Sequence, residues 1–120
     1  MLDLRLDLML KSALKEITDK VVKAAKESLG DKLDKVILYG SYARGDYTDE
    51  SDVDIMVLAD VSKDEVRDIE KELWSIGWEL GYEHDILVCI YVTDCITFNK
   101  FINDLPYYTN INREGILLSA

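Results

Sequence analysis

The sequence predicts an α/β fold, a single small domain in which a short mixed β-sheet is flanked by helices. Short apolar runs rich in β-branched residues alternate with longer segments of helical periodicity, which is the pattern of an α/β protein. The predicted strands are apolar on both faces beyond their acidic ends, so helices should cover the sheet on at least one side. With 120 residues and a hydrophobic fraction of 48%, residues 1–120 can form one domain with a genuine core.

The first half of the chain predicts a long helix, two strands and a loop. Apolar side chains recur at helical spacing up to Gly30, at Leu10, Leu14, Ile17, Val21, Ala25 and Leu29. Residues 1–10 alternate Leu with Asp and Arg, a pattern that a strand also shows, but we expect one long helix. Its opening leucines are expected to pack in the core, and an exposed apolar edge for a partner is the alternative. Strands are predicted over 34–39 and 53–59, and the polar residues 46–51 predict a loop between them.

A second helix follows the second strand. Ser62-Lys63-Asp64-Glu65 is typical of a capping box, and the apolar stripe that follows it predicts a helix that stops at Gly81. Trp74 and Trp78 extend this stripe, and at such spacing the tryptophans are expected in the core.

The last third of the chain predicts a third strand and two helical segments. Residues 85–92 are mostly apolar and predict a strand that starts with an acid. Residues 98–105 predict a short helix that is broken near Pro106. The tail, residues 107–120, has a helical pattern up to Gly115 and is apolar beyond it.

A Gly-Ser turn follows the first predicted strand. The apolar run Val36-Ile37-Leu38-Tyr39 ends at Gly40, where the backbone is free to turn sharply. Ser41 can cap a short helix, and the free N–H groups at a helix start attract phosphate oxygens. Arg44 lies about one helical turn further on, with donors that suit either a phosphate or a structural carboxylate. Gly45 would close this short helix.

Two carboxylates come next, at the spacing of a strand. Asp52 and Asp54 are two residues apart, so on a strand they project from the same face with Cα atoms about 7 Å apart. Like charges held this close repel each other unless a cation lies between them. Hard oxygen ligands of this kind suit Mg²⁺, which keeps its other positions for water and substrate phosphates.

These motifs together resemble the signature of a known superfamily. Gly40-Ser41, the spacer with Arg44-Gly45, and Ser51-Asp52-Val53-Asp54 are similar to the signature of the polymerase-β-like nucleotidyltransferases, above all their minimal nucleotidyltransferase (MNT) domains. The resemblance is densest from Val36 to Ile55, and the order of elements and the length fit such a domain over nearly the whole chain. It implies transfer of AMP from ATP to a hydroxyl, with two Mg²⁺ ions, for which Mn²⁺ can substitute.

The resemblance also implies which residues would hold the metal ions. Asp52 and Asp54 match the metal-binding pair of the family, and Asp85 is the candidate for the third carboxylate, beside the acceptor hydroxyl. Asp85 could also take the proton of that hydroxyl. Asp94 is the competing candidate, but it lies at the far end of the same predicted strand, in what resembles a turn.

The nucleotide would be held by the turn and the loop. By the same resemblance, Gly40 and Ser41 contact the β- and γ-phosphates through a backbone N–H and a hydroxyl, and Arg44 adds charge there. We place Ser51 in the same group of nucleotide-binding residues, and we expect it to brace the loop and not to react.

Charge and composition narrow the partners. The formal net charge is −10, which disfavours long nucleic acid but permits a nucleoside triphosphate held by metal ions and amides, or a basic protein surface. No segment approaches the length of about 20 apolar residues that spans a membrane, so we expect a cytoplasmic protein. Cys89 and Cys95 are too few for a disulfide framework and are expected to be free thiols.

The acceptor stays open at this point. Many stand-alone MNT domains are encoded with HEPN-domain proteins and act as antitoxins that adenylylate a tyrosine of the toxin, so the resemblance implies a HEPN partner. A small-molecule nucleotidyltransferase that modifies an antibiotic as a homodimer fits the same motif. A catalytically silent nucleotide-binding or interaction module is the third alternative. The oligomeric state, homodimer or hetero-oligomer, and the nucleotide preference do not follow from the sequence.

Overall fold

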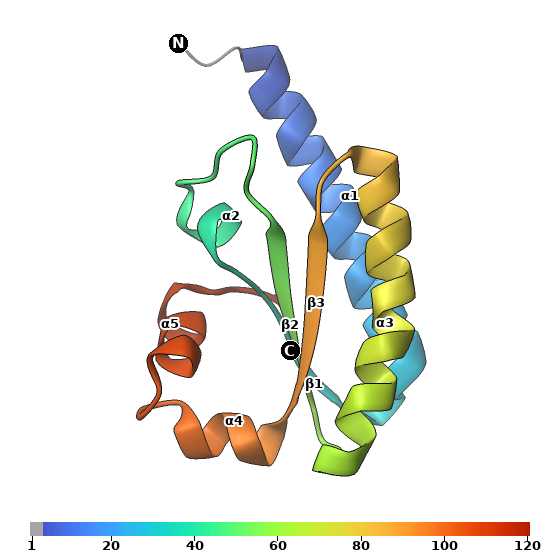
Figure 1. The fold of residues 1–120 in the computed structure, drawn as a ribbon, viewed down its shortest axis with the longest axis vertical. Coiled ribbons are helices and arrows are strands. Elements are labelled where there is room, and N and C mark those ends of the chain that lie inside the picture. The colour runs from blue at the N-terminus through green and yellow to red at the C-terminus, as the bar shows by residue number, and fades with distance from the viewer. Residues whose placement is uncertain (1–3) are drawn as a thin grey trace.

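The computed structural model describes residues 4–120, and the side chains from residue 11 onward. Its centre is a four-stranded sheet with the order β3-β2-β1-β4 (Figure 1). The strands are β1 (Leu33–Tyr39), β2 (Val53–Ala59), β3 (Val88–Asp94) and β4 (Ile116–Ser119). β1 runs antiparallel to β2 and β4, whereas β2 and β3 are parallel. The predicted mixed sheet flanked by helices is confirmed.

Two long helices cover one face of the sheet. α1 (Leu4–Leu29) and α3 (Lys63–His84) pack against each other and against the strands (Figure 1). Alternate residues of each strand point to this face, which makes it wholly apolar. Side chains that are less than 2% exposed fill the layer, among them Ile17, Val21, Val36, Val53, Ile55, Val57, Leu73 and Ile90. This layer supplies most of the hydrophobic core.

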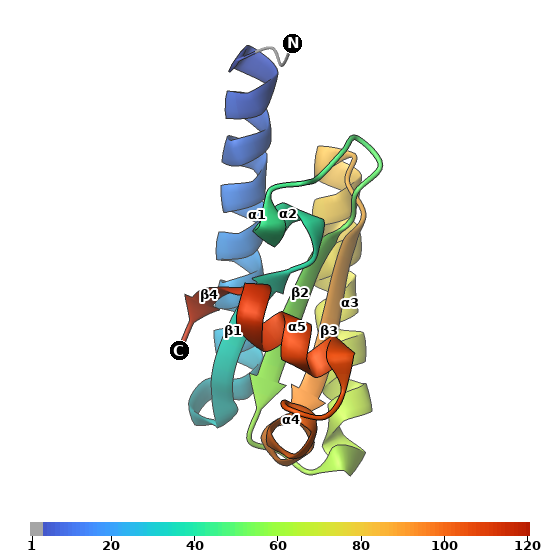
Figure 2. The same ribbon diagram turned by 90° about the vertical axis from the view of Figure 1, so that its left-hand side faces the viewer.

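Two shorter helices cover part of the opposite face. α4 (Cys95–Phe101) and α5 (Pro106–Glu114) lie in front of the strands in Figure 2. A second, smaller apolar cluster joins them to the sheet, made of Ile37, Met56, Leu58, Phe98 and Ile111. Tyr39 and Asp54 lie two residues from Ile37 and Met56 along their strands, so they continue this face beyond the cluster. The polar end of the sheet therefore adjoins α5 and not the main core.

Most of the predicted elements are confirmed. The first long helix ends at Leu29, and a 3₁₀ turn, η1 (Gly30–Lys32), leads into β1. The strand predicted over 53–59 has those bounds, and the strand predicted over 34–39 begins one residue earlier. α5 ends at Glu114 and is capped by Gly115, which agrees with the predicted helical pattern up to Gly115. For residues 1–10, positions 1–3 lie outside the described residues, and the backbone from residue 4 is helical.

The boundary between α3 and β3 is a correction. The prediction that the helix stops at Gly81 is wrong, because α3 continues to His84. A Cβ at Gly81 would lie 2.7 Å from the Ile86 carbonyl oxygen, so this glycine permits close packing of α3 on the following segment. The chain turns instead at Asp85, which has a φ of 53°. The third strand starts at Val88 and not at residue 85.

Further features differ from the predictions or were not predicted. Trp74 and Trp78 are 44% and 73% exposed, so the expectation that they lie in the core is wrong. β3 is an edge strand, and no described element covers the side of α3 that extends past it. The apolar tail forms β4, which pairs with β1, and the short helix expected over 98–105 is α4, which begins at Cys95.

None of the helices within residues 4–120 is both long enough and apolar enough to cross a membrane.

Candidate active site

The chain turns away from β1 at Gly40, whose backbone has φ 76° and ψ −157°. L-residues rarely adopt such a φ. A Cβ at this position would lie 2.6 Å from Oδ2 of Asp54. Glycine is therefore required twice here, for the turn itself and for the close approach of the Asp54 carboxylate.

The turn leads into α2 (Ser41–Arg44), a single helical turn. Two of its amides donate to the Gly40 carbonyl oxygen at 3.1 Å, and the amide of Gly45 donates to the Ser41 carbonyl oxygen at 2.9 Å. Tyr42 is buried, and its ring stacks on Tyr47 with the ring centroids 4.7 Å apart. This stack attaches α2 to the loop over 46–51 and so holds Ser41 in place.

Asp52 and Asp54 lie at the start of β2. Asp54 pairs with Tyr39 of β1 and with Cys89 of β3, and it is partly buried, whereas Asp52 precedes the strand and is exposed. Burial raises the pKa of Asp54 above its ordinary value, the charge of Asp52 raises it further, and Arg44 acts in the opposite direction. Two carboxylates thus repel each other in a partly desolvated place, which a bound cation would relieve.

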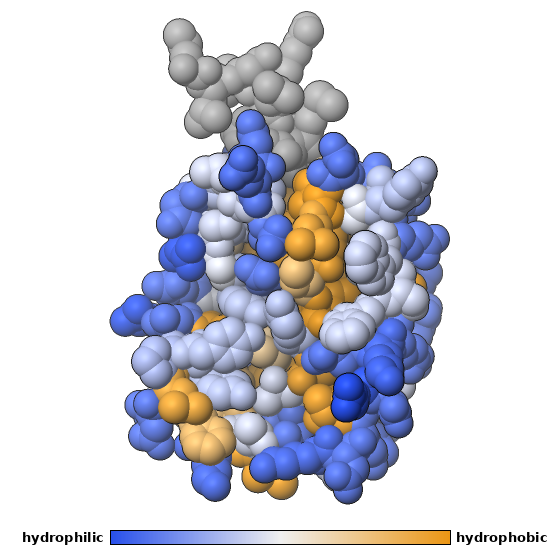
Figure 3. Space-filling view, in the orientation of Figure 1, coloured by the Kyte–Doolittle hydropathy of each residue, from blue (hydrophilic) through white to orange (hydrophobic). Residues whose placement is uncertain are grey.

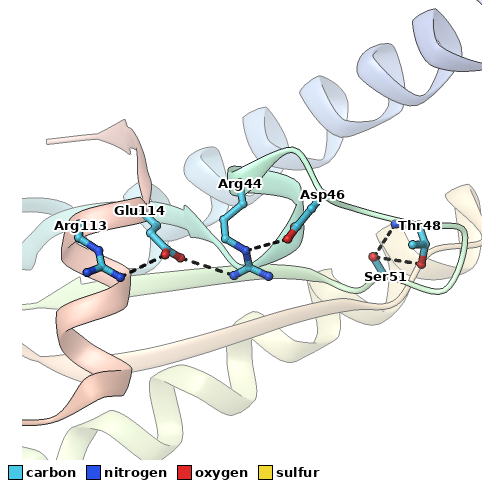
Figure 4. A network of polar contacts seen from close by, with 6 residues as sticks. All are labelled: Arg44, Asp46, Thr48, Ser51, Arg113 and Glu114. Atoms are coloured by element: carbon cyan, nitrogen blue, oxygen red, sulfur yellow. Dashed lines mark hydrogen bonds and ion pairs between the residues drawn. The ribbon is translucent and has the colours of Figure 1, made fainter.

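Arg44 lies in a chain of charged side chains that joins α2 to α5 (Figure 4). Its Nε donates to Oδ2 of Asp46 at 3.3 Å, and its Nη1 lies 3.6 Å from Oε2 of Glu114. Arg113 reaches the other carboxylate oxygen of Glu114 at 3.4 Å. Of the two roles that the sequence left open for Arg44, these contacts are those of a structural carboxylate partner. The guanidinium is partly exposed, so the pairs are weak and exchangeable.

Ser51 braces the loop that precedes β2. Its hydroxyl accepts a hydrogen bond from the Thr48 amide at 2.8 Å (Figure 4), and its own amide donates to the Thr48 carbonyl oxygen at 3.1 Å. These two bonds close the loop directly before Asp52 and thereby limit the positions that the Asp52 carboxylate can take.

A hollow of about 370 Å³ opens between β1, α2 and α5. It brings four of the predicted site residues together with residues of α5, and its lining is Tyr39, Gly40, Ser41, Arg44, Asp54, Tyr107, Asn110, Ile111 and Glu114. The hydroxyls of Tyr39 and Tyr107 lie 2.9 Å apart. Burial is the main cause that raises the pKa of Tyr39, so this pair stays protonated at neutral pH. The hollow combines two carboxylates, a guanidinium, a helix start and two phenols.

Residues 18–116 match the model of the nucleotidyltransferase domain family. The chain belongs to this family. A protein of Methanocaldococcus jannaschii, named a putative protein adenylyltransferase, is 37% identical over 97 residues, which are 81% of this chain and 89% of the relative. The membership that the Gly-Ser and Asp-x-Asp motifs predicted is thereby confirmed.

Solved structures agree on the fold. The crystal structure of a putative nucleotidyltransferase from Sulfolobus solfataricus has a TM-score of 0.59 at 21% identity, covering 90% of this chain and 83% of that one. A chain in the crystal structure of a toxin-antitoxin with AMP-PNP has a TM-score of 0.51 at 20% identity, covering 86% and 73%. The architecture is therefore that of a nucleotidyltransferase domain.

In this nucleotidyltransferase domain, Asp85 does not lie on the strand that it was predicted to start. It is the C-cap residue of α3, has a left-handed backbone conformation and lies three residues before β3. Among the described side chains, Asp85 does not join Asp52 and Asp54 in a group whose ligand atoms all lie within 4.8 Å of one another. The difference arises because α3 runs past Gly81, which shifts the start of β3 toward the C-terminus.

Asp94, the competing acid, has a structural role. It is 5% exposed and caps α4, with its Oδ2 accepting from the Thr97 amide at 2.9 Å. Although burial acts to raise it, the bonds from Thr97 hold the pKa of Asp94 below its ordinary value. It pairs with Ala59, at the opposite end of β2 from Asp54.

Among the described side chains, a different group does bring its possible ligand atoms within 4.8 Å of one another. Glu16, Glu83 and His84 come together between α1 and α3. The ammonium of Lys20 already lies 2.9 Å from Glu16 and 3.7 Å from Glu83, so both carboxylates have a cationic partner within the protein. The group is a link between two core helices.

Sequence reasoning missed the contribution of α5 to the site. Tyr107, Asn110 and Glu114 line the hollow from this helix, although the sequence marked it only as a helical tail. Pro106 at its first position is a start signal, but nothing local shows that the helix folds back over Tyr39. Only the packing of Ile111 into the second cluster sets that direction.

We predict that Gly40→Ala removes metal- and nucleotide-dependent stabilisation, because the new methyl group would displace the Asp54 carboxylate. Gly45→Ala is the matched control, since Gly45 also has a positive φ, 88°, but a Cβ there meets nothing within 4 Å. Both variants should lose about 1 kcal/mol of stability from backbone strain. In thermal unfolding with ATP and Mg²⁺, only Gly45→Ala should keep the ligand-induced rise in Tm. An equal rise in both variants would contradict this role of Gly40.

The raised pKa of Asp54 predicts a pH-dependent cost to stability. A carboxyl whose folded-state pKa exceeds its unfolded value binds more protons when folded, so stability falls as pH rises from the ordinary Asp pKa through the raised one. Asp54→Asn should therefore raise the free energy of unfolding at pH 7, and the gain should vanish below the ordinary Asp pKa. Urea denaturation at both pH values measures it. Asp104→Asn, at an exposed loop position, should show no such gain, and a wild-type protein more stable than Asp54→Asn at pH 7 would refute the account.

Proposed function

We propose that this domain transfers AMP from ATP to a tyrosine hydroxyl of a partner protein, a HEPN-domain toxin, and so acts as an antitoxin in the cytoplasm. The observation that carries the proposal is the approach of the Asp54 carboxylate to the Gly40 turn, beside Asp52. Family membership supports nucleotidyl transfer, and the name of the Methanocaldococcus jannaschii relative supports a protein as acceptor.

The donor set fits Mg²⁺ or Mn²⁺. Asp52 and Asp54 offer hard oxygen ligands, and a cation bound between them would oppose the burial and the charge of Asp52 that raise the pKa of Asp54. These two residues would hold the metal. When bound, it lowers the pKa of the acceptor hydroxyl and neutralises the charge of the departing pyrophosphate.

The Gly-Ser turn would bind the triphosphate. Ser41 lines the hollow beside Asp54, and its amide and hydroxyl can donate to phosphate oxygens. Arg44 lines the same hollow and contacts Asp46 and Glu114 only through long, exposed pairs. A phosphate can therefore recruit the guanidinium from these carboxylates at little cost.

The third acid remains a proposal, and its place in the chain favours Asp85 over Asp94. The amide of Val53 donates to the Leu87 carbonyl oxygen at 2.9 Å, so Leu87 lies level with the start of β2. Asp85 precedes Leu87 by two residues and is exposed at this end of the sheet. Asp94 caps α4 at the other end. We assign Asp85 to the acceptor side, where it would accept the hydroxyl proton.

A protein acceptor fits the shape of the site. The hollow beside Gly40 has room for part of a nucleotide, while Cys89, which pairs with Asp54, lines an open groove along the edge strand β3. The related fold in a toxin-antitoxin with AMP-PNP supports a toxin as the partner and ATP as the donor. A hydroxyl that a partner brings to the open side would meet the α-phosphate next to Asp54.

We predict that incubation with ATP, Mg²⁺ and the HEPN protein encoded in the neighbouring reading frame adds the mass of AMP to that protein. Intact mass spectrometry measures the increase, and fragmentation should locate it on a tyrosine. Asp54→Asn and Asp85→Asn should abolish transfer, because each removes a charged group from the reacting centre. Asp94→Asn is the matched control and should transfer AMP, with a loss confined to stability.

Two outcomes would overturn the proposal. If an aminoglycoside-like small molecule gains AMP while the HEPN protein keeps its mass, the domain is a small-molecule nucleotidyltransferase. If neither is modified although ATP binds, the domain is a catalytically silent nucleotide-binding module. A transfer that survives Asp85→Asn but not Asp94→Asn would reverse the choice of the third acid.

A further inference from the structure

An apolar groove runs along the junction of α3 and β3, outside the nucleotide hollow. It has a volume of about 540 Å³. We call it the α3–β3 groove, and the twelve residues that line it include Trp74, Trp78, Tyr82, Leu87, Cys89 and Tyr91. In Figure 3 an orange strip lies over the upper part of β3, beside paler side chains toward α3.

The groove exposes an unusual amount of aromatic surface. Tyr82 is 92% exposed, Trp78 73% and Leu87 52%. Isolated apolar side chains on a surface need no explanation, but a contiguous patch of this kind marks an interaction site. Trp and Tyr are also the side chains that contribute most to binding energy in protein interfaces.

The edge of β3 is closed to an added strand along part of its length. The indole N–H of Trp74 donates to the Ile90 carbonyl oxygen at 2.9 Å, and the Val92 amide donates to Oε2 of Glu70 at 2.8 Å. The Ile90 carbonyl and the Val92 amide face outward from the sheet edge, and an added strand would need both as hydrogen-bond partners. An occupant therefore inserts side chains between α3 and β3, which is the binding mode of an amphipathic helix in a groove.

The groove reaches the catalytic carboxylates. Cys89, one of its lining residues, pairs with Asp54 in the β2–β3 register. Burial raises the pKa of the Cys89 thiol, and the charges of Asp54 and Asp52 raise it further, so this side chain lies in the field of both acids. The groove therefore meets Asp54 from β3, whereas the nucleotide hollow meets it from β1.

The negative charge of the residues around the groove favours a positively charged occupant. Residues 74–91, the stretch that lines the groove, contain three acids, Glu79, Glu83 and Asp85, and no Lys or Arg. A second copy of this chain, with its own net charge of −10, would be repelled from this surface. A basic partner would be attracted to it.

We propose that the α3–β3 groove docks a basic amphipathic helix of the acceptor protein and so presents the acceptor hydroxyl to Asp54. The proposal rests on the proposed function for the identity of the acceptor, and it adds where and by what chemistry the acceptor is recognised. Apolar side chains of the helix fill the groove between the tryptophans and Leu87, while its Lys and Arg residues face the acidic surroundings.

Tryptophan fluorescence tests the proposal without any assay of transfer. The chain has two tryptophans, and both line the groove. The probe is a tryptophan-free helical peptide with Leu at positions i, i+3, i+4 and i+7 and Lys elsewhere; the matched peptide has Glu in place of Lys. The Lys peptide should give a saturable blue shift at low salt, because it removes the indoles from water, and the Glu peptide should give none.

Variants locate the binding site. Tyr82→Ala with Leu87→Ala should weaken binding of the Lys peptide by about tenfold or more, and circular dichroism should show the fold unchanged, since both side chains are exposed. Ile96→Ala is the matched control, because Ile96 is 75% exposed on α4, and it should bind as the wild type does.

The Tyr82→Ala, Leu87→Ala protein should also show a raised KM for the HEPN protein with kcat retained. No blue shift, an equal response to both peptides, or equal weakening by Ile96→Ala would overturn the docking proposal. The proposal would also be overturned if the wild type sedimented as a dimer and the double variant as a monomer, since the occupant of the groove would then be a second copy of the chain. Because peptide binding needs no transfer, failure here is distinguishable from failure of the proposed function.

Discussion

The site depends on one steric constraint, the contact between the backbone of Gly40 and the carboxylate of Asp54. The antiparallel pairing of Tyr39 with Asp54 brings the end of β1 beside the start of β2, and the absence of a Cβ at Gly40 lets Asp54 lie against the turn. The Gly-Ser turn, for which we propose phosphate binding, and the carboxylate pair are thereby held together at one point of the sheet. The apolar layer under α1 and α3 keeps both strands in register and so preserves this contact.

The two faces of the sheet have separate tasks. The face under α1 and α3 is apolar throughout and supplies stability, and the face toward α4 and α5 is apolar only as far as Ile37 and Met56. Beyond that point the same strands carry Tyr39 and Asp54, where burial and like charge raise the pKa of the carboxyl. The repulsion and burial of this carboxyl lower the stability of the domain locally, and the apolar layer on the opposite face compensates for that loss. Such a division is common at functional sites.

The sequence predicted what local patterns determine. The strands around the turn, the glycine that closes α2 and the pair Asp52 and Asp54 follow from periodicity, turn chemistry and spacing. The features that it missed depend on tertiary packing. Gly81 has the appearance of a helix stop, but the structure uses it for close approach of α3 to the Ile86 carbonyl, and this moves Asp85 off the strand. Trp74 and Trp78 follow the apolar stripe of α3, and only the edge position of β3 leaves them exposed.

The most direct test of the account is the binding of Mn²⁺ in the presence of AMP-PNP, followed by electron paramagnetic resonance. The account predicts that the wild type binds Mn²⁺, that the double variant Asp52→Asn, Asp54→Asn loses this binding, and that Asp94→Asn, which alters a buried acid at the other end of β2 and β3, retains it. Binding in the double variant equal to that of the wild type would contradict the assignment of this carboxylate pair as the metal site.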